Sequence, residues 1–189
     1  LDGSEPTAAS PRYTGPVEIG KSARFRATAL REGGENASYS REFAFSKSTG
    51  RPAVLNTKPN DSYTFEGASL LVDGYHSRPV FTSGAWLGYL DEPLDVTIDM
   101  GGEQSYRSVE LETLAEKGDW IFPPSSVTVW VSDNGTDFTE VASVAVPEAK
   151  AGDADGIGRY RMQFPETSAR YLKVVAQNAA AIPAWHPGA

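Results

Sequence analysis

The sequence predicts an all-β protein built from antiparallel β-sandwiches. Apolar residues recur with a period of two over short segments, which is typical of strands with one buried face. Gly, Pro, Asn and Asp separate these segments, as they do in sandwiches whose strands are joined by tight turns. No stretch shows a sustained helical period, so we expect no long helix.

The expected strands follow one another along the chain. In the first, Ala23, Phe25, Ala27 and Ala29 alternate with polar residues. The most regular alternation places three valines on one face of residues 126–132 and Trp130 on the other. Together the expected strands cover residues 22–30, 41–47, 93–100, 106–114, 126–132, 138–146, 159–164 and 170–177.

The composition changes around residues 46–67, which are rich in Ser, Pro, Gly, Asn and Lys and have no sustained period. This predicts a linker or a loose connecting strand. We therefore expect a small β domain over residues 1–48, a linker over 49–62 and a larger sandwich over 63–189. The small domain is too short to be stable alone and is expected to lean on its neighbour. Its first strand, and the last strand of the sandwich, are expected to lie outside this chain.

Composition and charge exclude several classes of protein. The 189 residues carry 17 basic and 25 acidic side chains, a net charge of −8, whereas nucleic-acid surfaces need clustered Lys and Arg. No apolar run approaches the roughly 20 residues of a membrane span, and residues 1–20 carry no secretion signal. The absence of cysteine excludes disulfides, a thiolate nucleophile and Cys-ligated zinc. We expect no nucleic-acid partner and no membrane insertion.

The four tryptophans are the most informative residues. Trp130 lies within a predicted strand, where it is expected to cover its cross-strand neighbours. Trp86, Trp120 and Trp185 lie in loops beside glycine or proline, and each could be a core anchor or a ring presented to a ligand. Proline on either side of Trp185 stiffens its loop, which lowers the entropic cost of presenting the ring. Presentation is favoured for Trp120 and Trp185 over Trp86.

Polar side chains share the loops of these tryptophans. Arg78, Lys117, Asp119 and the two histidines can make directional hydrogen bonds. A flat ring beside such groups suits a sugar, which has an apolar face and a rim of hydroxyls. Catalysis has little support, because the sequence has no nucleophile motif, no metal-site spacing and no carboxylate pair marked out by its position. The acidic segment DADG, residues 153–156, is predicted to be an acidic turn.

Four segments resemble a known pair of domains. LDGSEPTAASPRYTGPVEI, residues 1–19, resembles the small β domain that follows the catalytic barrel in bacterial, Bacteroides-like β-N-acetylhexosaminidases (chitobiases) of glycoside hydrolase family 20. Residues 70–101, 118–141 and 169–189, which include GDWIFPP and PAWHPG, resemble the coagulation factor 5/8 type C, or discoidin, domain. The resemblance covers nearly the whole chain. It implies a discoidin or galactose-binding-like jelly-roll sandwich similar to carbohydrate-binding module family 32.

The resemblance also implies a site in the loops at one end of the sandwich. Carried over to this sequence, the carbohydrate-binding residues are His76, Trp86, Asp119, Trp120, Trp185 and His186, and Arg78 is added as a hydrogen-bonding side chain of the same loop as His76. Such domains often hold a structural calcium near the DG turn, which implies Asp73 as a ligand. No other cofactor is implied.

The expected function is that of a non-catalytic accessory region of a periplasmic, outer-surface or secreted β-N-acetylhexosaminidase. Its partners would be glycans containing N-acetylglucosamine, galactose or related sugars, and the catalytic domain of the same polypeptide. One alternative is a purely structural module that packs on the catalytic domain and uses the loop tryptophans as interface residues. A second is a discoidin-type binder of proteins or cell surfaces, with apolar side chains at its loop tips.

Overall fold

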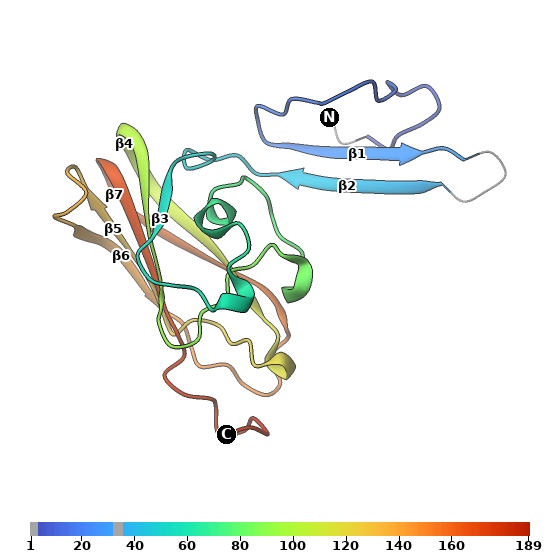
Figure 1. Ribbon diagram of the computed structural model, residues 1–189. Helices are drawn as coiled ribbons and strands as arrows, with labels where there is room; N and C mark the ends of the chain where they lie inside the picture. The colour runs from blue at the N-terminus through green and yellow to red at the C-terminus, as the bar shows by residue number, and fades with distance from the viewer. Residues whose placement is uncertain (1–3, 32–35) are drawn as a thin grey trace. The chain divides into compact units, whose positions relative to one another are not determined.

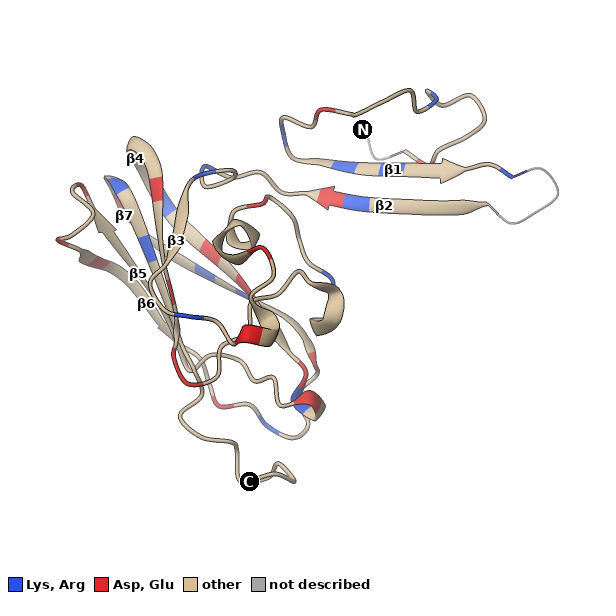
Figure 2. Cartoon of the chain, viewed as in Figure 1, with Lys and Arg blue, Asp and Glu red and all other residues tan. Residues whose placement is uncertain are grey.

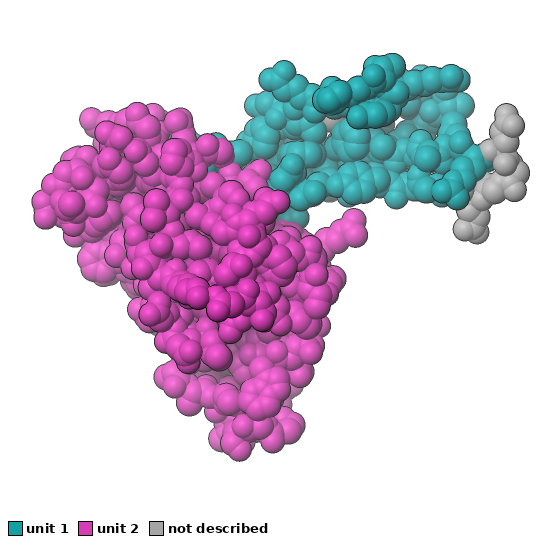
Figure 3. All heavy atoms as spheres, viewed as in Figure 1, with its two compact units in different colours: residues 1–49, 74–76 teal, residues 50–73, 77–189 magenta. Residues whose placement is uncertain are grey.

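The computed structural model describes residues 4–31 and 36–189. Two compact units make up the chain (Figure 3). Unit 1 comprises residues 1–49 and 74–76, and unit 2 comprises residues 50–73 and 77–189. The described part of the chain contains β-strands and four short 3₁₀ turns but no α-helix, so the prediction of an all-β protein is confirmed. None of its helical turns is long and apolar enough to cross a membrane.

Unit 1 is built on one antiparallel hairpin. Strand β1 (Ala23–Ala29) pairs with β2 (Ala37–Phe43) in a register that sets Ala23 opposite Phe43. Strand β2 thus begins and ends earlier than the predicted strand at residues 41–47. A short return of the chain completes the unit, because Phe43 bridges to Tyr75 and the Ala44 N–H donates to the Gly74 carbonyl at 2.7 Å.

Unit 2 contains a five-stranded antiparallel sheet with the order β3-β4-β7-β5-β6 (Figure 1). Its strands are β3 (Ala53–Leu55), β4 (Leu94–Ala115), β5 (Ser126–Ser132), β6 (Thr139–Ala145) and β7 (Gly156–Gln177). Strand β3 lies within residues 49–62, the segment predicted as a linker or loose connecting strand, and it pairs with β4. Strands β5 and β6 match the predicted segments closely.

The two long strands differ from the sequence-based prediction. Residues 93–100 and 106–114 were predicted as separate strands but form the single strand β4, and the two segments predicted from residue 159 onward form β7. The β4–β7 pairing shifts register between Asp99 and Gln104, where Gly101 has a φ of +77°. The irregular residues therefore bend the strand instead of ending it, which is the usual effect of a β-bulge.

One hydrophobic core holds unit 2 together. Val127 and Val129 of β5 are completely buried, and Val131 is 7% exposed, so their predicted face is the core face. Trp130 has the opposite parity and is half-buried, as predicted. Burying each valine contributes about 1.5–3 kcal/mol relative to leaving it exposed. The core extends to side chains from both ends of the long strands, among them Val96, Ile98, Met100, Tyr106, Met162, Phe164, Leu172 and Val174.

The segment between β3 and β4 adds to this core. It carries the turns η1 (Asp61–Tyr63), η2 (Gly67–Leu71) and η3 (Phe81–Ser83), drawn in green in Figure 1. Val72 from this segment is 5% exposed and belongs to the core, with Leu71 and Tyr89 packed against it. Irregular backbone thus buries apolar surface that the five strands would leave open.

The outer face of the sheet is polar. Asp95 of β4 pairs with Lys173 of β7 at 3.0 Å, and Asp99 pairs with Arg170 at 2.8 Å. Figure 2 shows positive and negative residues interspersed along β4 and β7. The sheet therefore has one apolar and one charged face, which is the consequence of its period-two sequence.

Candidate ligand-binding site

The turn after β4 presents Trp120 to solvent. Glu116 and Ile121 exchange backbone hydrogen bonds of 2.9 and 3.1 Å, which close the loop around η4 (Lys117–Asp119). The Trp120 N–H donates to the Lys117 carbonyl at 3.1 Å, and Trp120 has a φ of 64°. A left-handed backbone is unusual for a bulky residue and persists only where the surroundings enforce it. The indole that results is 55% exposed.

The C-terminal segment docks on this turn through His186. The His186 ring is 8% exposed, and its Nε2 lies 3.0 Å from the Lys117 carbonyl oxygen. The Gly188 N–H donates to Nδ1 at 3.2 Å, so Nδ1 must be the acceptor. The proton therefore resides on Nε2, which donates to Lys117. This pair of hydrogen bonds requires a neutral imidazole in a fixed orientation.

His186 is the centre of a cluster of rings. Its centroid lies 4.7 Å from that of Trp120, 5.4 Å from that of Phe122 and 5.8 Å from that of Trp185, all with edge-to-face geometry. The Trp185 Nε1–H donates to the Ala149 carbonyl at 2.9 Å, yet the residue is still 37% exposed. Both tryptophans are thus held by contacts along one part of the ring and leave the rest accessible.

A buried lysine joins a third segment to the site. Lys117 is 7% exposed, and its Nζ donates to the Asp153 carbonyl at 2.8 Å and to the Asp155 carboxylate. The Lys117 backbone N–H donates to the same carboxylate oxygen at 3.1 Å. The hydrogen bond from the Lys117 side chain is the main reason that the pKa of Asp155 is lowered from its ordinary value.

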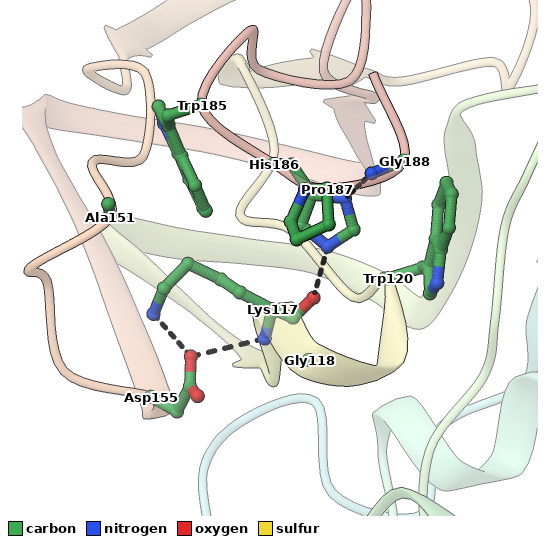
Figure 4. A pocket seen from close by; sticks show the side chains of 9 residues that line it. All are labelled: Lys117, Gly118, Trp120, Ala151, Asp155, Trp185, His186, Pro187 and Gly188. Carbon is green, nitrogen blue, oxygen red and sulfur yellow. Dashed lines mark hydrogen bonds and ion pairs between the residues drawn. The ribbon is translucent and has the colours of Figure 1, made fainter.

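These three segments line an open pocket of about 480 Å³ (Figure 4). It is lined by Lys117, Gly118, Trp120, Ala151, Asp155, Trp185, His186, Pro187 and Gly188. In Figure 4 the two indoles lie on opposite sides of His186, and the Lys117–Asp155 pair lies below Trp185. The pocket therefore combines aromatic surface with one internally paired charge.

The structure brings together three of the predicted carbohydrate-binding residues. Trp120, Trp185 and His186 all line the pocket. Asp119 lies in η4 and is exposed next to Trp120 but is not a lining residue.

The other predicted residues lie elsewhere. Arg78 and Trp86 belong to unit 2 but do not line the pocket, and the Trp86 Nε1–H donates to the Arg78 carbonyl at 2.8 Å. His76 belongs to unit 1. Trp86 is half-buried and makes a local structural contact, which is the alternative that the sequence left open for it.

The Lys117–Asp155 pair was missed as part of the site. The sequence analysis noted Lys117 as a hydrogen-bonding side chain and residues 153–156 as an acidic turn, but nothing in the sequence indicated that the two are partners 38 positions apart. For the predicted calcium ligand Asp73, the described residues contain no cluster of three or more His, Asp or Glu side chains that could hold a metal ion. Calcium at Asp73 stays a prediction without support from such a cluster.

Comparison with known families supports this description of the chain. The model of the F5/8 type C domain matches residues 55–188. The chain belongs to the F5/8 type C domain family. Ahead of this F5/8 type C region, residues 1–41 match the model of the chitobiase/β-hexosaminidase C-terminal domain. The two domain families that the sequence resembles are thereby confirmed, whereas the Bacteroides-like source and glycoside hydrolase family 20 stay predictions. No curated protein matches the chain.

Several solved structures resemble the F5/8 type C region distantly. Chitosan-binding module 1 of a chitosanase/glucanase from Paenibacillus sp. IK-5 is 18% identical with a TM-score of 0.48, covering 72% of this chain and 89% of the module. Module 2 of that enzyme, in complex with chitotriose, is 16% identical with a TM-score of 0.48, covering 72% and 91%. CpGH89CBM32-5 from Clostridium perfringens, in complex with GalNAc-β-1,3-galactose, is 17% identical with a TM-score of 0.45, covering 69% and 86%.

Proposed function

We propose that unit 2 is a non-catalytic carbohydrate-binding module whose site is the pocket formed by Trp120, Trp185 and His186. The observation that carries the proposal is the pair of anchored but accessible indoles on either side of a buried histidine (Figure 4). A soluble domain gains stability by burying Trp, so an indole that is 55% exposed in a backbone conformation unfavourable for its type points to a ligand.

The chemistry of the pocket suits a sugar ring. The apolar face of a pyranose can stack on an indole, while its hydroxyls need a few directional partners. The second oxygen of the Asp155 carboxylate and the exposed Asp119 side chain can accept hydrogen bonds from such hydroxyls. An open site that contacts one or two rings binds weakly, on the order of millimolar, which corresponds to about −4 kcal/mol.

The accessory role follows from the order of the two regions. The chitobiase/β-hexosaminidase C-terminal match over residues 1–41 precedes the F5/8 type C match, and this order supports a place beside the catalytic domain of a β-N-acetylhexosaminidase. We propose that the chemistry belongs to that domain, and that the protein is periplasmic, exposed on the outer surface or secreted. Weak binding is useful in this setting because tethering raises the local concentration of substrate.

The test is a titration that follows the four tryptophan indole N–H signals in NMR spectra while N-acetylglucosamine, galactose or N-acetylgalactosamine is added to millimolar excess. We expect saturable shifts of the Trp120 and Trp185 signals with at least one sugar, and no shift of the Trp86 and Trp130 signals. Trp120→Ala should abolish binding. Trp86→Phe is the matched control and should bind like the unmodified protein, because Trp86 does not line the pocket.

Three results would contradict the proposal. If no sugar shifts any indole signal, the loop tryptophans serve a structural or protein-binding role. If Trp86→Phe abolishes binding while Trp120→Ala does not, the ligand site lies in a different loop. Turnover of an aryl β-N-acetylglucosaminide by the isolated chain would contradict the non-catalytic assignment.

A further inference from the structure

We infer that the Lys117–Asp155 pair sets the charge specificity of the pocket, so that it accepts uncharged sugar residues and excludes anionic ones such as uronic acids. The inference rests on the proposed function and goes beyond it by naming the ligand class and the residues that select it. The Lys117 ammonium is a buried cation, and neither the stacking of a sugar on the indoles nor the hydrogen bonds of His186 require one.

The charges that line the pocket cancel one another. Lys117 and Asp155 are the lining residues with ionised side chains, and they are paired with each other. His186 is neutral, because its Nδ1 accepts from Gly188 while its Nε2 donates to Lys117. The lining itself therefore presents no uncompensated charge, and the exposed carboxylate of Asp119 beside Trp120 is negative. Both features favour a neutral sugar over an anionic one.

The ammonium group is held away from ligands. Lys117 is 7% exposed, and two of the three Nζ donors are used by the Asp153 carbonyl and the Asp155 carboxylate. The same carboxylate also accepts the Lys117 backbone N–H, so Asp155 is held at two points. An anionic sugar would have to displace this intramolecular carboxylate, or bind beside it and experience its negative charge.

Removal of the Asp155 charge should reverse this preference. The Lys117 ammonium would remain largely buried without a counter-ion, and a ligand carboxylate could provide one. A hydrogen bond between two charged groups is substantially stronger than one between neutral groups. If the Lys117–Asp155 pair only held the loops together, Asp155→Asn would lower the affinity for all ligands alike. If Asp155 screens the Lys117 charge from ligands, Asp155→Asn raises the affinity for anionic ligands alone.

The test compares two matched ligand pairs, as methyl glycosides: galactose with galacturonic acid, and glucose with glucuronic acid. Affinities are measured by indole NMR titration at neutral pH in low and high salt. The unmodified protein should prefer the neutral member of the pair that it binds. Asp155→Asn should raise the affinity for the uronide relative to the neutral sugar by about tenfold, and salt should diminish that gain.

Two control variants isolate the cause. Asp153→Asn makes the same change in net charge in the same loop, but Asp153 contacts Lys117 through its backbone carbonyl, so the ligand preference should not change. Adding Lys117→Met to Asp155→Asn should remove the gain for uronides, because the unpaired cation is then absent. Thermal unfolding of every variant checks that the fold survives.

Each outcome is decisive. If the unmodified protein binds a neutral sugar and Asp155→Asn brings no gain for uronides, the inference is wrong and the proposed function stands. If no variant binds any sugar, both the inference and the proposed function are wrong. If only Asp155→Asn binds a ligand, and that ligand is a uronide, the charge selection by the Lys117–Asp155 pair is supported and the binding of neutral sugars is contradicted. Should Asp155→Asn fail to fold, Lys117→Met must strengthen the exclusion of uronides, and an unchanged preference overturns the inference.

Discussion

Replacement of Gly188 by alanine tests how the pocket holds Trp120. A Cβ on Gly188 would lie 2.8 Å from Cζ3 of the indole and closer still to Cη2 and Cζ2, well inside van der Waals contact. Gly188 does not have a positive φ, so alanine introduces no backbone strain of its own. The effect of Gly188→Ala is therefore steric and falls on the Trp120 ring.

The cost can be worked out from the exposure of the ring. Because Trp120 is 55% exposed, the indole can move outward instead of compressing the core. That movement sacrifices its edge contact with His186, at 4.7 Å between centroids, which is worth about 0.5–1.5 kcal/mol. We expect a fall in Tm of about 2–4 °C for each kcal/mol lost. A displaced stacking surface should weaken sugar binding about tenfold, which corresponds to roughly 1.4 kcal/mol.

The assay combines thermal unfolding with the indole NMR titration. Gly118→Ala is the control, since Gly118 lines the same pocket, has no positive φ and has no atom within 4 Å of an added Cβ. The control should change neither Tm nor affinity appreciably. If Gly188→Ala leaves the Trp120 indole signal and the affinity unchanged, the packing of Trp120 on the C-terminal segment is not what positions the ring.

Two further predictions concern the scaffold. Val129→Ala should lower the free energy of unfolding by about 2–3 kcal/mol because Val129 is completely buried, whereas Val54→Ala, at a side chain 62% exposed, should change it by less than about 0.5 kcal/mol; denaturant unfolding measures both. The hydrogen bond from Arg170, followed by that from the Gly101 N–H, lowers the pKa of Asp99 to about 2. The ionised Asp99 carboxylate stabilises the folded protein, and this stabilisation is complete above the ordinary pKa of 3.8 and is lost as the pH falls through about 2. Arg170→Gln should therefore move the Asp99 carboxyl titration, followed by NMR, towards 3.8. An unchanged midpoint would show that Arg170 is not the cause of the lowered pKa.

Local sequence was sufficient to predict the faces of the strands. The alternation of Val127, Val129 and Val131 with Trp130 predicted which side of β5 is buried, because side-chain direction in a strand has a strict period of two. The same reasoning could not show that β4 continues through Gly101, since a glycine with φ of +77° can end a strand or bend it.

The candidate site was predicted only in part. Trp120 and Trp185 were identifiable because tryptophan in a glycine- or proline-flanked loop is unusual, and both line the pocket. His76 was predicted from a similar loop, between Gly74 and Pro79, but belongs to the other unit. Residue type and loop composition indicate which side chains can bind a ligand, but they do not indicate which loops meet.

The sequence by itself determined the all-β class, the alternation of its strands and the loop tryptophans that could serve a ligand. Only the tertiary structure decided that Lys117, Asp155 and His186 form one site, because Asp155 lies 38 positions and His186 lies 69 positions after Lys117 along the chain. The physical reason is that periodicity reports the local environment of each strand. The meeting of three loops depends instead on how the strands pair and bend, which is set by packing between distant parts of the chain.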